Sequence, residues 1–150
     1  MSSHRIGLLA LQGDYEAHGK ALVRAGFPRC DMVEIRSFSD LQSLTAIIIP
    51  GGESTVMSML LERFGMFEEL KRQIENGMPV LATCAGLILL AKNIEGNDQM
   101  GLGVLDIKVK RNAYGRQVDS FHAPVQTIID SVGIIEGIFI RAPRILASGK

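Results

Sequence analysis

The sequence predicts an α/β protein with a mostly parallel central sheet and helices on both faces of that sheet. Short apolar segments, typical of buried strands, alternate with segments of helical periodicity over the first part of the chain. Glycine-containing turns separate these segments. The chain has 150 residues, of which 47% are hydrophobic, so we expect one domain with a substantial core over residues 1–150.

Four strands and their helices are expected in the first part of the chain. The strands are predicted over residues 5–11, 32–35, 46–49 and 79–82. Helices are predicted over residues 15–25, 56–64 and 66–75, and another begins at Leu87 and runs to Lys92. Ser54 or Thr55 is a typical cap for the second of these helices. Residues 37–44 are expected to form a turn or a short helix.

The pattern changes after Lys92. Residues 93–103 are polar and contain glycine, which is typical of a loop. Residues 104–110 alternate between apolar and polar side chains, as in a half-exposed strand. Further strands are predicted over residues 118–125 and 137–140.

Composition excludes several classes of function. Lys and Arg together number 16, as do Asp and Glu, so the net charge is about zero. The sequence shows no basic stripe or polybasic segment of the kind that binds nucleic acid or a membrane surface. No apolar run is long enough to span a membrane, and the first residues do not resemble a secretory signal. The two cysteines form no C-x-x-C pair, which argues against a disulfide framework or a zinc site. We expect a cytoplasmic protein without a metal or another cofactor.

The segment around Cys84 is the strongest candidate for chemistry. A short apolar strand leads into four small residues, 83–86, and these lead into an apolar helix. A nucleophile on such a strand-to-helix turn is exposed at the edge of the sheet, and N–H groups at the start of a helix can stabilise a thiolate. The alternative is a buried structural cysteine, which is the commoner fate of a free thiol.

Three loops are expected to meet at one edge of the sheet. Gln12-Gly13, Gly51-Gly52 and Cys84 each follow a predicted strand, and ligands of parallel sheets bind at the carboxyl ends of the strands. This convergence favours a reactive Cys84. The N–H of Ala85 and an N–H near Gly51-Gly52 would be the donors for a developing oxyanion. Alternatively, the two glycines only form a turn.

The histidine that would activate the thiol is harder to identify. His4 precedes the first strand and should lie at the opposite end of the sheet. His18 is expected on the surface of the first helix. His122 could lie near the strand ends, but none of the three histidines has a carboxylate two residues later.

Six motifs in chain order carry a family resemblance. They lie at residues 9–13, 50–55, 83–91, 111–117, 119–121 and 139–143. Together they resemble the glutaminase subunits of pyridoxal 5'-phosphate synthase, which are class I (triad-type) glutamine amidotransferases. The resemblance extends from the first strand almost to the last residue.

The resemblance implies a flavodoxin-like three-layer α/β/α fold and a reaction with L-glutamine. Cys84 would attack the side-chain amide, release ammonia and form a glutamyl thioester that water hydrolyses. The ammonia would pass to the synthase subunit for pyridoxal phosphate (vitamin B6) synthesis, and the Gln12-Gly13 loop would respond to docking of that subunit. The implied glutamine-binding residues are Gly52, Glu53, Ser54, Arg111, Ile140 and Arg141. The implied oxyanion hole involves Gly51, Gly52 and Ala85.

Three departures from the family pattern affect the expected activity. Ala82 replaces a usual glycine, and His122 replaces a usual glutamate. The family's catalytic histidine and glutamate lie in a His-Pro-Glu motif downstream of residues 139–143, and these 150 residues contain no His-x-Glu. We therefore expect a C-terminally shortened member that lacks the family's last elements and has little glutaminase activity.

Two other functions remain open at this point. The chain could be a non-catalytic binding module that docks on the synthase subunit. It could also be a different cysteine-elbow protein, such as a small hydrolase or a redox-responsive protein, which would not need the motifs at 50–55 and 111–117.

Overall fold

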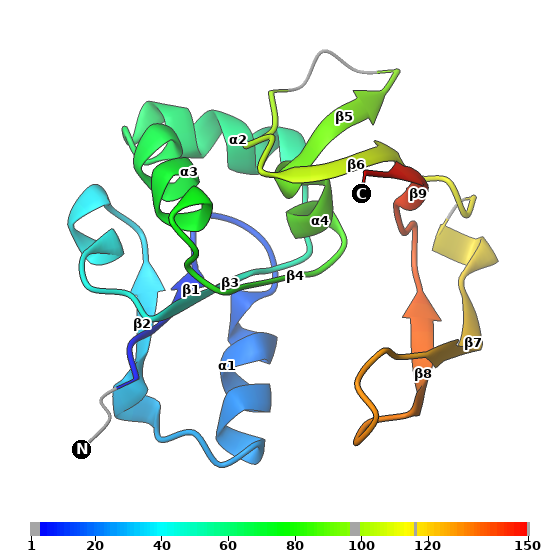
Figure 1. The fold of residues 1–150 in the computed structure, drawn as a ribbon, viewed down its shortest axis with the longest axis horizontal. Coiled ribbons are helices and arrows are strands. Elements are labelled where there is room, and N and C mark those ends of the chain that lie inside the picture. Colours follow the sequence, from blue (N-terminus) through cyan, green and yellow to red (C-terminus); the bar gives the residue numbers. More distant parts are fainter. Residues whose placement is uncertain (1–3, 97–99, 116, 150) are drawn as a thin grey trace.

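The computed structural model describes residues 4–96, 100–115 and 117–149 (Figure 1). The first part of the chain contains the strands β1 (Ile6–Leu9), β2 (Met32–Ile35), β3 (Ala46–Ile49) and β4 (Val80–Ala82). Its helices are α1 (Tyr15–Arg24), α2 (Ser54–Arg63), α3 (Phe67–Glu75) and α4 (Ala85–Leu90). The later strands are β5 (Ala91–Glu95), β6 (Leu105–Lys110), β7 (Phe121–Gln126), β8 (Ile134–Phe139) and β9 (Arg144–Ser148). Short 3-10 helices occupy Arg29–Asp31, Phe38–Leu41 and Gln117–Asp119.

The central sheet is parallel and has the strand order β2-β1-β3-β4. Its register pairs Ile6 with Met32 and with Ala46 in the two neighbours of β1, and Ile47 with Val80. Helix α1 covers one face, whereas α2, α3 and α4 lie on the other (Figure 1). This arrangement confirms the predicted α/β/α fold class.

Each face of the sheet has its own hydrophobic cluster. The larger cluster joins β3 to α2, α3 and α4, and its fully buried members include Ile49, Met57, Leu70 and Leu89. On the other face, Ile6, Leu8 and Ile48 pack against α1 and the residues around it. Buried apolar surface of this kind is the main favourable contribution to folding, at about 25 cal/mol per Å².

Two smaller sheets follow the central one. Strands β5, β6 and β9 form a mixed sheet, with β5 parallel and β9 antiparallel to β6. Strands β7 and β8 form an antiparallel pair (Figure 1). The Tyr114 ring packs against the rings of Phe121 and Phe139 on this pair of strands. The Phe121 and Phe139 rings are stacked, with their centroids 4.9 Å apart.

The structure corrects several predicted boundaries in the second half. The helix of residues 87–92 ends at Leu90, and β5 replaces the first part of the loop predicted over 93–103. Strand β8 begins at Ile134 rather than at residue 137, and β9 was not predicted. Strand β5 forms although its sequence is largely polar, because it pairs with β6 and because Glu95 forms an ion pair with Lys108 at 3.2 Å. Both contacts are made with a later segment of the chain, so the local propensity of residues 91–95 does not reveal them.

Among the described residues, no helix combines the length and the apolar character needed to cross a membrane.

Candidate active site

Cys84 occupies a strained turn between β4 and α4. Its backbone has φ 47° and ψ −104°, a conformation that costs a residue other than glycine about 1–3 kcal/mol. Three hydrogen bonds hold the turn: Thr83 N–H donates to Ile49 O at 3.1 Å, Gly86 N–H to Thr83 O at 2.8 Å, and Ile88 N–H to Cys84 O at 3.3 Å. Helix α4 begins at Ala85, two residues before the predicted start, so the cysteine directly precedes the helix.

Gly86 lets α4 pack directly against β3. A Cβ at this position would lie 2.5 Å from Ile49 O and 2.9 Å from Ile49 Cγ2. Only glycine therefore allows the first turn of α4 to approach the end of β3 so closely.

The loops after β1 and β3 meet beside Cys84, as the sequence predicts. A Cβ on Gly51 would lie 3.4 Å from Cys84 Cβ, so the backbone of this loop borders the cysteine. A Cβ on Gly52 would collide with Gln12 Oε1, and one on Gly13 would collide with Gly51 O. The two loops are also hydrogen-bonded, because Glu53 N–H donates to Gln12 Oε1 at 2.8 Å and Asp14 N–H to Gly51 O at 3.2 Å.

The start of α2 brings two predicted glutamine-binding residues together. The helix begins at Ser54, which is buried, and Glu53 is its N-cap residue, so the predicted start at Val56 is two residues late. Arg111 follows β6 and donates from Nη2 to Glu53 Oε1 at 2.6 Å and from Nη1 to Thr55 Oγ1 at 3.1 Å. A cationic and an anionic side chain therefore lie side by side next to the glycine loop.

A cavity of about 710 Å³ opens over Cys84. Its walls come from the first turns of α1 and α4 and from the end of β8 and the residues that follow it. The lining residues are Asp14, His18, Thr83, Cys84, Leu87, Ile138, Phe139, Ile140, Ala142 and Pro143. Of the predicted glutamine-binding residues, Ile140 lines this cavity, and Arg141 follows it with a positive φ of 49°. Arg116, part of the motif at residues 111–117, lies outside the described residues.

The structure changes the interpretation of two histidines. His18, predicted to be a surface residue, lines the Cys84 cavity, and its Nε2 lies 3.2 Å from Thr83 Oγ1. His122 lies on β7, where its Nδ1 is 3.0 Å from Glu136 Oε1, and it lines a different cavity of about 360 Å³. The proximity of His18 had one signal in the sequence: α1 begins directly after the loop that follows β1, so its first turn borders the carboxyl edge of the sheet.

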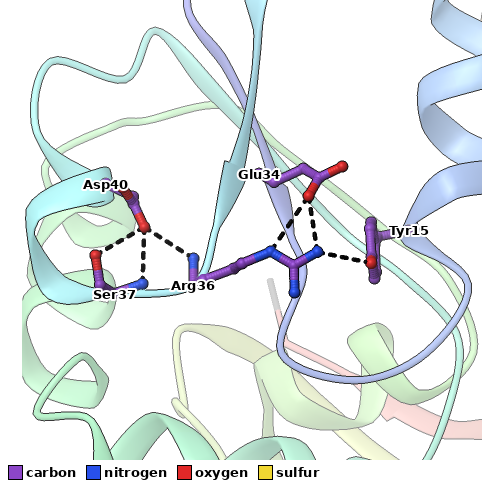
Figure 2. A network of polar contacts seen from close by, with 5 residues as sticks. All are labelled: Tyr15, Glu34, Arg36, Ser37 and Asp40. Carbon is purple, nitrogen blue, oxygen red and sulfur yellow. Dashed lines mark hydrogen bonds and ion pairs between the residues drawn. The ribbon is translucent and has the colours of Figure 1, made fainter.

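A polar network joins the start of α1 to the end of β2, the edge strand of the central sheet, and to the residues that follow it (Figure 2). Arg36, which follows β2, donates to Glu34 Oε2 at 2.8 Å and to the Tyr15 hydroxyl at 2.9 Å, and both contacts raise the pKa of the guanidinium. The Asp40 carboxylate accepts from the backbone N–H of Arg36 and from the hydroxyl and N–H of Ser37, and these bonds lower its pKa. The loop after β2 is thereby tied to the first residue of α1.

Comparison with known proteins agrees with this geometry. Residues 8–150 match the SNO glutamine amidotransferase family. A pyridoxal 5'-phosphate synthase subunit PdxT from Pyrococcus furiosus is 49% identical over 148 residues, which cover 95% of this chain and 74% of the relative. The protein of the same name from Thermotoga maritima is 47% identical over 146 residues, which cover 97% of this chain and 76% of the relative.

A solved structure supports the same relationship at the level of the fold. A protein described as glutamine amidotransferase superposes with a TM-score of 0.87 at 42% sequence identity, over 97% of this chain and 76% of its own. The Cys84 turn, the Gly51-Gly52 loop and the cavity therefore occur in a chain that superposes on such a protein over 97% of its own length. The chain belongs to the SNO glutamine amidotransferase family.

Proposed function

We propose that this protein is the glutaminase subunit of pyridoxal 5'-phosphate synthase, which releases ammonia from L-glutamine for use by the synthase subunit. The names of the relatives from Pyrococcus and Thermotoga support this function. One structural observation carries the chemistry: Cys84 is held at positive φ between β4 and α4, at the base of a cavity and against the backbone of Gly51. Activity requires no metal or other cofactor in this proposal.

The proposed reaction has two steps. Cys84 Sγ attacks the side-chain carbonyl carbon of glutamine, and the C–N bond breaks as the nitrogen gains a proton and leaves as ammonia. The resulting glutamyl thioester is then attacked by water, which yields glutamate and returns the proton to sulfur. Both steps pass through a tetrahedral oxyanion, and we assign its stabilisation to backbone N–H groups of Gly51, Gly52 and Ala85.

Groups suited to the amino-acid end of glutamine lie beside the Gly51-Gly52 loop, which in turn borders Cys84. The Glu53 carboxylate matches the α-ammonium group, and the Arg111 guanidinium matches the α-carboxylate, which it can bind with two parallel hydrogen bonds. In the structure these two side chains bind each other at 2.6 Å, so they are already positioned before substrate arrives. Ser54, Ile140 and Arg141 complete the proposed glutamine site.

The partner and its location follow from the same proposal. Ammonia that escapes into neutral water is protonated and loses its nucleophilicity, so direct transfer to a docked synthase subunit is favoured. The Gln12-Gly13 loop is suited to respond to docking, because the Gln12 side chain holds the backbone of Glu53 next to the glycine loop. We place the complex in the cytoplasm.

The glutaminase activity expected of the described residues depends on which histidine could take the proton of the Cys84 thiol. Among the described residues, the histidine with a carboxylate within hydrogen-bond distance is His122, and it lines a cavity other than that of Cys84. This observation favours a second candidate function for the isolated polypeptide, a binding module that docks on the synthase subunit with little turnover. We therefore expect docking in either case and slow glutamine hydrolysis by these residues alone.

The test combines binding and turnover. The polypeptide is co-purified with the synthase subunit, and ammonia release is measured for wild type, Cys84→Ala and Cys30→Ala. Cys30 is a matched control because it is exposed and precedes β2, whereas Cys84 follows β4, so the two cysteines lie at opposite edges of the parallel sheet. Glutamine should protect Cys84, and not Cys30, from alkylation. Loss of docking together with absence of protection would refute the proposed function. Turnover that survives Cys84→Ala would refute the assignment of the nucleophile.

A further inference from the structure

The first turn of α1 contacts the loops after the three other strands of the central sheet. Asp14, its N-cap residue, donates its N–H to Gly51 O after β3, and Tyr15 accepts from Arg36 after β2 (Figure 2). His18, one turn further along the helix, contacts Thr83 after β4. The start of α1 therefore contacts the loop that follows each of the other three strands.

The contact of His18 with Thr83 is the one that reaches the cysteine. Thr83 immediately precedes Cys84, and its backbone N–H and C=O are both used in holding the turn. Its hydroxyl is hydrogen-bonded to His18 Nε2 at 3.2 Å, and both residues line the Cys84 cavity. Because a threonine side chain has few rotamers, fixing its hydroxyl fixes the orientation of the residue that leads into the elbow.

We infer that His18 is a positioning residue for Cys84 and acts through the Thr83 hydroxyl. The strained backbone of Cys84 persists only while its surroundings over-determine it, and the His18–Thr83 bond is a side-chain restraint on the residue before it. The inference concerns the geometry of the thiol. Its meaning for catalysis rests on the proposed function, in which the same thiol attacks glutamine.

The experiment measures thiol reactivity, so it does not depend on glutaminase turnover. The intact polypeptide is alkylated with iodoacetamide, and the rates at Cys84 and Cys30 are followed by peptide mass spectrometry, with exposed Cys30 as internal reference. His18→Leu and Thr83→Val are each expected to lower the Cys84-to-Cys30 rate ratio about fivefold, the equivalent of one neutral hydrogen bond of about 1 kcal/mol.

Three comparisons separate positioning from a general effect on folding. His18→Gln keeps a hydrogen-bonding group near the position of Nε2 and should restore most of the ratio. The double variant His18→Leu/Thr83→Val should lose no more than either single variant, because both remove the same bond. Tyr15→Phe is the matched control: it removes a hydroxyl contact from the same turn of α1, on the side of Arg36, and should leave the ratio unchanged.

The outcomes are decisive in both directions. An unchanged ratio in His18→Leu and Thr83→Val, additive losses in the double variant, or an equal loss in Tyr15→Phe would each overturn the inference. If His18→Leu does not fold, as judged by circular dichroism, Thr83→Val and His18→Gln still test it from either end of the bond. Since no glutamine is present, failure here leaves the proposed function to its own test.

Discussion

Replacement of Gly86 by alanine should destabilise the protein, although alanine favours helices. In an unconstrained helix interior the change would stabilise by about 1 kcal/mol. Here the new Cβ would lie 2.5 Å from Ile49 O, a backbone atom of the central sheet that cannot rotate away. Overpacking of a core costs about 1–3 kcal/mol. Ile49 O also accepts the N–H of Thr83, so displacing this oxygen would also strain the turn that holds Cys84. Because the clash is with a backbone atom, we place the cost near the upper end of this range, and subtracting the gain in helix propensity leaves a net loss of about 2 kcal/mol.

The matched control is Gly19→Ala in α1. Gly19 is also a buried helical glycine, but the nearest atom to its added Cβ is Leu8 Cδ1 at 3.2 Å, the end of a side chain that can shift. This variant should stay within about 0.5 kcal/mol of wild type or become more stable, because the gain in helix propensity offsets the tighter contact.

Urea unfolding followed by circular dichroism measures both variants, and linear extrapolation gives the free energies of unfolding. Alkylation of Cys84 in Gly86→Ala would show in addition whether the displaced turn alters the thiol. A Gly86→Ala protein as stable as wild type would refute the argument, since it would mean that α4 can move away from β3 at no cost. Equal destabilisation in Gly19→Ala would also refute it, because the type of contacting atom would then not matter.

Two further predictions concern charged groups. Arg111→Gln should raise the glutamine concentration that half-protects Cys84 from alkylation by about 10-fold or more, because a charged hydrogen bond contributes about 1.5–3 kcal/mol; unchanged protection would argue against Arg111 as a glutamine-binding residue. The Arg72 guanidinium, with a further hydrogen bond from Gln73, lowers the pKa of Glu69 from 4.5 to about 2. Because the folded-state pKa lies below the unfolded value, this carboxylate stabilises the fold above about pH 4.5, and the contribution is lost as pH falls towards 2. Glu69→Gln should therefore unfold more easily at pH 7 by about 0.5 kcal/mol, a value discounted for the exposed Arg72, and should converge with wild type near pH 2; a difference that is constant with pH would contradict the assignment.

Local sequence signals were sufficient for the elements of the central sheet. Each of its four strands is a short apolar segment bounded by turn residues, and the expected strands overlap β1 to β4. The boundaries of α2 and α4 were shifted by two residues, because Glu53 and Cys84 cap these helices without a side-chain hydrogen bond that the sequence could reveal. Strands β5 and β9 were missed for a different reason. Their residues have little apolar periodicity, and pairing with β6 alone makes them strands.

By itself the sequence determined which chemistry is available and at which edge of the fold it lies. Alternation of strands and helices produces a parallel sheet, and in a parallel sheet Gln12, Gly51 and Cys84 must all follow strands at the same edge. Tertiary structure decided which side chains meet there. Arg111 reaches Glu53 across 58 residues of sequence, and His18 reaches Thr83 across 65. The His18 contact depends on the strand order β2-β1-β3-β4 and on the side from which α1 crosses the sheet, whereas the Arg111 contact depends on how the β5-β6-β9 sheet brings the end of β6 to the start of α2. No periodicity within a single element encodes that order, because it follows from the packing of all the elements together.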